Sequence, residues 1–139
     1  MKALLAMLFM FVLFAALMSD TNIRKADTQQ NIGSMFFCER YNTKYDMPIN
    51  VSNRFTRGNI CVITNLGYSI NQSYVIIQLD RLNPVTHQYE YYNSYNFTVN
   101  PSYSYIYFNN VYFGMSGHYR VFLLRQDRQV IISGLVEII

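Results

Sequence analysis

The chain of 139 residues has no tryptophan, only two cysteines and two histidines, and a charged fraction of 14%. Globular domains usually have a charged fraction of about 25%. The hydrophobic fraction of 51% excludes a disordered chain, and the length excludes a multidomain enzyme. The formal net charge of +3 is too small for the basic stripe that nucleic-acid binding requires. We therefore expect one domain with one modest core.

Residue types that carry catalysis or metal binding are few and scattered. The sequence contains no G-x-S-x-G nucleophile elbow, no H-E-x-x-H helix and no glycine-rich phosphate loop. Its two cysteines and two histidines form no recognisable pairs of metal ligands. We expect His87 and His118 to face solvent. The sequence thus predicts no catalytic residues, no metal and no cofactor, and a protein that is not an enzyme.

The N-terminus has the form of a targeting segment. Met1-Lys2 is followed by sixteen apolar residues, Ala3 to Met18, without a charge. A positive start before an apolar run is typical of a secretory signal, and a core helix would have a polar face. We expect a hydrophobic signal helix or uncleaved anchor over residues 1–19, a polar spacer over 20–33 and a domain over 34–139. Either form places the domain outside the cytoplasm: secreted, periplasmic or at the cell surface.

After residue 34 the pattern is typical of β-structure throughout. Short runs rich in Val, Ile, Tyr, Phe and Thr alternate with Gly, Pro and Asn, and no helical period persists. This predicts an all-β fold, an antiparallel β-sandwich of about 7–9 strands. The strands that we expect are 34–41, 48–55, 58–66, 73–81, 87–92, 95–99, 104–113, 117–125 and 129–138.

The clearest element is the last hairpin. On its first strand Tyr119, Val121 and Leu123 share one face. On its second strand the same face holds Val130, Ile132, Gly134, Val136 and Ile138. A polar turn joins the two strands, so both rows are expected to point into the core. Earlier in the chain, Val75, Ile77 and Leu79 form another inward row.

The segment Ser116-Gly117-His118-Tyr119-Arg120-Val121 resembles the G-x-Y-x-C stretch of immunoglobulin-like sandwiches. The resemblance implies an immunoglobulin-like or fibronectin-type domain with Tyr119 as a tyrosine corner, whose hydroxyl bonds back to the backbone. Val121 stands where that family has its second cysteine, and the family's core tryptophan is missing. The resemblance covers strand order and one motif, and function does not follow from it.

Cys38 and Cys61 are the only cysteines. An even count in an exported chain favours a disulfide. They lie on the first and third predicted strands, which can be neighbours in a sandwich of this kind. The alternative is two separate buried thiols, since free cysteine behaves as a small hydrophobic residue.

Alternation in the strands predicts an apolar outer face. Residues opposite in parity to the inward rows are expected to lie together on it: Tyr74, Ile76, Arg120, Phe122, Leu124, Ile131 and Leu135. Monomers rarely expose such a patch, and aromatic and arginine side chains are common at interfaces. We expect this face to bind a protein partner or another copy of the chain. A one-residue slip in register would bury it instead.

Tyrosine is concentrated over residues 89–112, which hold eight: Tyr89, Tyr91, Tyr92, Tyr95, Tyr103, Tyr105, Tyr107 and Tyr112. Aromatic surfaces bind sugars, so a carbohydrate-binding module is the alternative function. Cross-strand pairing would explain the tyrosines equally well. A small outer-membrane β-barrel is a further alternative, which the short strands and apolar inward rows disfavour. The C-terminal run, apolar except for Glu137, would invite strand addition if its edge were exposed.

Overall fold

The computed structural model describes residues 33–139, so the predicted leader and most of the spacer lie outside the described residues. Within 33–139 the chain is all-β, as predicted. None of these residues forms a helix long and apolar enough to cross a membrane.

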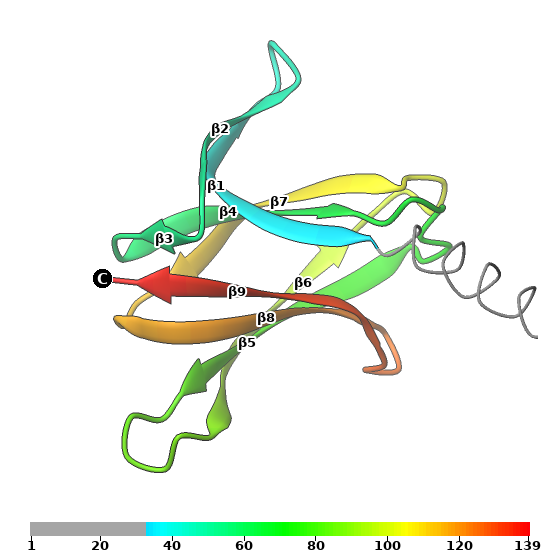
Figure 1. The fold of residues 1–139 in the computed structure, drawn as a ribbon. Coiled ribbons are helices and arrows are strands. Elements are labelled where there is room, and N and C mark those ends of the chain that lie inside the picture. The colour runs from blue at the N-terminus through cyan, green and yellow to red at the C-terminus, as the bar shows by residue number, and fades with distance from the viewer. Residues whose placement is uncertain (1–32) are drawn as a thin grey trace, which may run out of the picture. The chain divides into compact units, whose positions relative to one another are not determined.

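The strands form two sheets (Figure 1). The four-stranded sheet has the order β2-β1-β4-β7 and the five-stranded sheet the order β3-β9-β8-β5-β6. All pairings are antiparallel except that of β3 with β9. The bounds are β1 Ser34–Asn42, β2 Met47–Ser52, β3 Arg54–Phe55, β4 Gly58–Asn65, β5 Tyr74–Leu82, β6 Tyr89–Thr98, β7 Tyr105–Phe113, β8 Gly117–Arg125 and β9 Val130–Ile138.

The core lies between the two sheets and follows the predicted alternation. On β8 the side chains of Tyr119, Val121 and Leu123 are fully buried. The row on β5 and the residues Val136 and Ile138 on β9 join the same cluster. Burial of a large apolar side chain contributes about 1.5–3 kcal/mol, so these rows fix which face of each strand is dry.

Two strand boundaries differ from the prediction. The run 48–55 is divided at Asn53 into β2, which pairs with β1, and β3, which pairs with β9. The chain therefore passes from one sheet to the other inside a segment that has no glycine. The runs 87–92 and 95–99 are instead one strand, β6, because the residues between them continue the pairing with β5 across an irregularity at Leu79/Asp80.

A bulge in the last hairpin reverses two predicted orientations. Leu123 pairs with Ile132, but Leu124 pairs with Val130, so the register shifts by one residue at Ile131. Val130 consequently leaves the inward row and is 57% exposed. Ile131, predicted on the outer face, packs against the core cluster. A bulge adds one unpaired residue to a strand and moves every side chain beyond it to the other face.

Gly134 lies where side chains of β1 pack closely against β9. A Cβ built on Gly134 would lie 3.1 Å from Cγ of Met35 and 3.2 Å from Cζ of Phe37. These side chains come from the opposite layer, so the glycine lets the two sheets approach. The inward row of β9 from Ile132 to Ile138 thus includes one position without a side chain.

Tyr119 is anchored at both ends of its side chain. Its ring meets Phe113 and Tyr92 edge-on, with centroids 5.0 and 5.4 Å away. Its hydroxyl donates a hydrogen bond to the Met115 carbonyl at 2.6 Å. Burial raises the pKa of this hydroxyl to about 12. The turn before β8 is therefore tied to the core through one side chain.

The predicted disulfide is wrong: Cys38 and Cys61 are both free and buried. They are neighbours, paired directly across β1 and β4. Directly opposite side chains leave a sheet side by side on the same face, but a disulfide needs a short and specific geometry, and these two side chains are not at disulfide distance. Burial raises the pKa of both thiols above its ordinary value, which disfavours the reactive thiolate.

We predict that Tyr119→Phe lowers the free energy of unfolding by about 1–2 kcal/mol at neutral pH, because the Met115 carbonyl loses its donor. Tyrosine in the unfolded chain titrates near pH 10 and Tyr119 in the folded chain near 12. The stability that the buried neutral hydroxyl provides is complete below pH 10 and is lost as the pH rises toward 12. Urea denaturation at several pH values measures both effects.

The control for this substitution is Tyr45→Phe, since Tyr45 is 65% exposed. The variant at position 119 should also show a smaller loss of stability between pH 10 and 12 than the unmodified chain. Equal behaviour of the two variants would contradict the role assigned to Tyr119.

We predict that alkylation in denaturant without reductant adds a label to each of the two thiols, whereas neither thiol is labelled in the folded chain at neutral pH. Burial and the raised pKa both oppose reaction in the folded state. Mass spectrometry of the intact chain counts the labels. A chain that accepts label only after reduction would show a bridge and would contradict the assignment of Cys38 and Cys61 as free thiols.

Candidate functional site

The outer face of the five-stranded sheet gathers most of the predicted binding residues. Ile76 pairs with Leu124 across β5 and β8, and the two are 7% and 4% exposed although they point away from the core. Phe122, half-buried, lies between Gln78 and Ser133 on the neighbouring strands. Ile76, Leu124 and Phe122 together form an apolar strip across the middle of the face.

The remaining predicted residues border this strip. Tyr74 is half-buried at the start of β5, and Leu135 on β9 is 58% exposed. Arg120 pairs with Leu135 and places its guanidinium 4.6 Å from the centroid of the Tyr89 ring. Cation–π contacts of this kind contribute about 0.5–1 kcal/mol at exposed sites. Ile131 is the one predicted member that is not part of this outer face.

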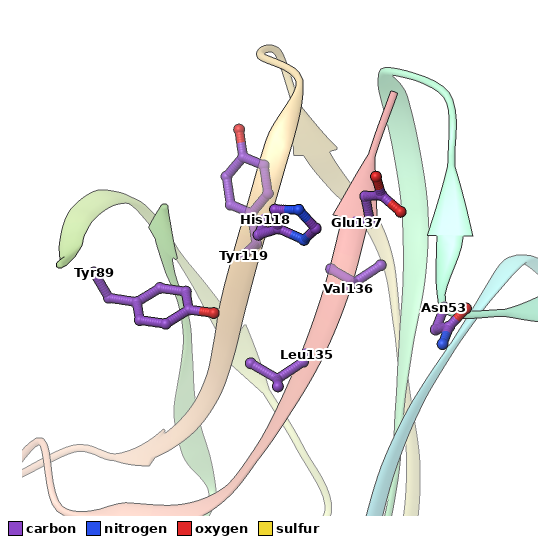
Figure 2. A pocket seen from close by; sticks show the side chains of 7 residues that line it. All are labelled: Asn53, Tyr89, His118, Tyr119, Leu135, Val136 and Glu137. Atoms are coloured by element: carbon purple, nitrogen blue, oxygen red, sulfur yellow. The ribbon is translucent and has the colours of Figure 1, made fainter. Parts of the chain in front are cut away.

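A shallow hollow of about 240 Å³ opens at the end of the face that is nearest to the C-terminus (Figure 2). Tyr89 lies on one side of it and Asn53 on the other, with His118 and Glu137 facing each other on paired strands. The full lining is Asn53, Tyr89, His118, Tyr119, Leu135, Val136 and Glu137. An aromatic ring, an imidazole, an amide and a carboxylate thus surround one small depression.

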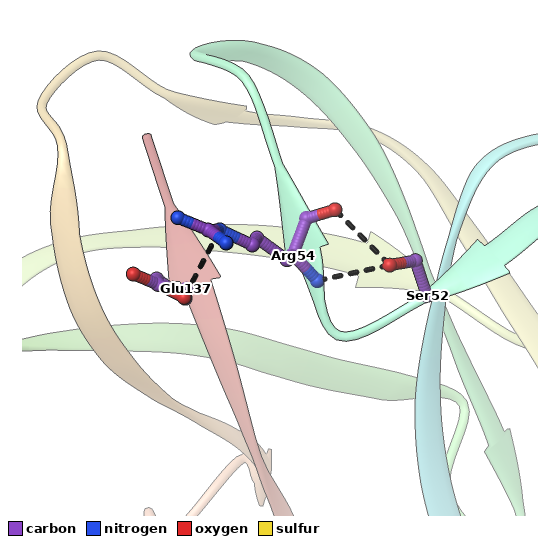
Figure 3. A network of polar contacts seen from close by, with 3 residues as sticks. All are labelled: Ser52, Arg54 and Glu137. Atoms are coloured by element: carbon purple, nitrogen blue, oxygen red, sulfur yellow. Dashed lines mark hydrogen bonds and ion pairs between the residues drawn. The ribbon is translucent and has the colours of Figure 1, made fainter.

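An ion pair holds β3 against β9 beside this hollow (Figure 3). Arg54 Nε lies 3.3 Å from Glu137 Oε2. The Ser52 hydroxyl donates to the Arg54 carbonyl and accepts from the Arg54 backbone N–H, each at 3.1 Å. Both charged side chains are exposed, and exposed pairs contribute at most about 1 kcal/mol. The network orients β3 and leaves the Glu137 carboxylate at the rim.

The tyrosine-rich segment does not form a single surface. Tyr92 and Tyr95 pack against the core, and Tyr91 and Tyr112 are exposed on different sheets. The Tyr95 hydroxyl donates to the Tyr112 carbonyl at 2.9 Å. The tyrosines therefore serve several separate contacts, mainly between strands.

A second aromatic cluster covers the outer face of the four-stranded sheet. Tyr41 stacks on Tyr107 with centroids 4.1 Å apart and rings nearly parallel, and it lies 6.4 Å from Tyr105. The Tyr41 hydroxyl donates to Asp46 at 2.8 Å, and burial is the main cause that raises its pKa well above the usual range. Beneath it lie the two thiols and Ile63. Sequence patterns miss this cluster because β1 and β7 are far apart in the chain.

Within residues 33–139 no group of three or more His, Cys, Asp or Glu side chains is placed to hold a metal ion. In residues of this range that are not exposed, every buried side-chain nitrogen or oxygen atom has a hydrogen-bond partner. His87 lies in the turn between β5 and β6 with φ 57°, on a different part of the chain from His118.

Comparison with known proteins assigns no family to the chain. No protein-family model matches it, and no curated protein sequence is significantly similar to it.

Proposed function

We propose that this protein is a non-catalytic binding module that acts outside the cytoplasm by binding a protein through the outer face of its five-stranded sheet. The observation that carries the proposal is the apolar outer face, on which half-buried Phe122 and exposed Leu135 adjoin the buried pair Ile76 and Leu124. Faces of this composition are typical of the centres of protein interfaces.

An immunoglobulin-like topology is part of the proposal. In that fold, strands B and E share one sheet and strands C, F and G the other. Here β4 and β7 share one sheet, and β5, β8 and β9 share the other. The hydrogen bond from Tyr119 to the Met115 carbonyl supports the same assignment, since a tyrosine corner has this geometry. Function does not follow from such a fold alone, so the proposed function rests on the outer face of the sheet.

The proposed location rests on the leader. The uncharged run from Ala3 to Met18 follows Lys2 directly, which is typical of secretory signals. Export would place the outer face in contact with secreted, periplasmic or cell-surface proteins.

We predict that a photo-crosslinking amino acid placed at Phe122 or Leu135 of the full chain, in the cells that produce it, forms adducts with protein. The matched control is Tyr112, which is 52% exposed and lies on the other sheet. Adducts are identified by mass spectrometry. Adducts that form only at position 112, or at none of the three positions, would contradict the proposal.

Carbohydrate binding is the second candidate, and the hollow in Figure 2 favours it. Sugars stack on aromatic rings and bond to amides and carboxylates, and Tyr89, Asn53 and Glu137 provide these groups. The aromatic part is smaller than the sequence suggested, because only one of the eight tyrosines from 89 to 112 lines the hollow.

We predict for this candidate that Tyr89→Ala abolishes binding on a glycan array, whereas Tyr91→Ala, at an exposed neighbour on the same strand, leaves it unchanged. Binding of no glycan by the unmodified chain, or equal binding by both variants, would exclude the hollow as a sugar site.

A further inference from the structure

The outer edge of β9 is only partly covered. Along its whole length β9 pairs with β8 on one side. On the other side β3 pairs only with Glu137 and Ile138. In the described part of the chain, no strand pairs with Val130–Leu135 on that side.

The hydrogen bonds from the end of β9 to β3 show which backbone groups of β9 point to this edge. The N–H of Glu137 donates to the Asn53 carbonyl and that of Ile139 to the Phe55 carbonyl, each at 2.9 Å. Alternate residues of a strand direct their backbone groups to the same side. The N–H and C=O of Leu135 and Ser133 therefore point to the same edge as those of Glu137, beyond the end of β3.

The other edges are less open to a new strand. The edge strand β2 contains Pro48, and β6 carries Glu90. On β7 the Tyr112 carbonyl already accepts the Tyr95 hydroxyl. Proline, charge and side-chain cover are the usual means by which proteins protect an edge.

The open part of β9 has none of these protections. Residues 129–136 carry no charge and no proline. Leu135 and Val130 are 58% and 57% exposed. The bulge at Ile131 limits the open stretch at one end, and β3 limits it at the other. An uncharged apolar edge of this kind accepts an extended strand without charge repulsion.

We propose that two copies of the chain associate by antiparallel pairing of their β9 edges, with Ser133 of one copy opposite Leu135 of the partner subunit. The proposal goes beyond the function proposed above, because it concerns the β9 edge of the five-stranded sheet and not the outer face. The two-fold axis would pass beside Gly134, and the two five-stranded sheets would become one continuous sheet.

In this register the β9 edge is complementary to the same edge of a second copy, so a second copy can pair with it. It pairs both backbone groups of Ser133 with both groups of Leu135 of the partner subunit, and symmetry repeats the pairing. Each exposed edge group thus receives a partner from the same edge of the other copy. The side chain of Leu135 lies diagonally across from Leu135 of the partner subunit, within reach of contact.

The test is amide hydrogen exchange on the full chain at two concentrations that differ roughly a hundredfold. We expect the Leu135 and Ser133 amides to exchange more slowly at the higher concentration. The Glu137 amide, already bonded to Asn53, should not change. These amides report on the edge itself, so association through the N-terminal segment or through the outer face leaves them unaltered. Exchange at Leu135 and Ser133 that is independent of concentration would overturn the proposal.

Two variants and a control add a second measurement, sedimentation velocity. Ser133→Pro removes an edge-facing N–H and leaves the ladder to β8 intact, and Leu135→Lys places like charges diagonally across the axis. Both should abolish the dimer, and Tyr112→Lys should retain it. The double variant Ser133→Glu/Leu135→Lys should restore the dimer, because each substituted position faces its opposite charge in the partner subunit.

A dimer that persists in Ser133→Pro and Leu135→Lys would overturn the proposal. A chain that is monomeric at both concentrations would overturn it as well. Crosslinks from Phe122 to a different protein, together with unchanged exchange at Leu135, would reject the β9 pairing and leave the proposed binding function in place.

Discussion

The structure depends on the burial of one row of β8 between the two sheets. Tyr119, Val121 and Leu123 are completely inaccessible, and removing such side chains from water is the largest favourable contribution to folding. Because side chains alternate along a strand, this row determines that Arg120 and Phe122 face outward. The tyrosine adds a directional constraint, since its hydroxyl holds the Met115 carbonyl and positions the turn before β8.

Much of this arrangement was predictable because large apolar or aromatic residues occupy every second position of the inward rows on β5 and β8. The all-β class and the inward rows of β5 and β8 are confirmed, whereas Val130 of the predicted row on β9 is exposed. The bulge at Ile131 was not predictable, since all residues from Val130 to Ile132 are apolar and β-branched and fit either face. The division of the run 48–55 at Asn53 was equally unpredictable from the sequence. It depends on which neighbouring strand offers unpaired backbone N–H and C=O groups.

The candidate site likewise combines contacts that a local sequence pattern predicts with contacts between residues that are far apart in the chain. The pairing of Ile76 with Leu124 follows from alternation once the two strands are adjacent. The hollow brings together Tyr89 of β6, Glu137 of β9 and Asn53 from the link between β2 and β3. No local pattern predicts that these three residues meet. The disulfide prediction was wrong although the two cysteines are neighbours, because sequence can indicate adjacency but does not give the orientation of side chains.

Alternation divides the side chains of β8 and β9 between a dry interior and an outer face, with the exception that the bulge at Ile131 introduces. A soluble paramagnetic agent tests it directly through the relaxation of methyl groups in the folded chain. We expect strong relaxation enhancement at Leu135 and Val130, which are exposed, and almost none at Val121 and Ile77, which are fully buried. Strong enhancement at Val121 and Ile77, with protection of Val130, would contradict it.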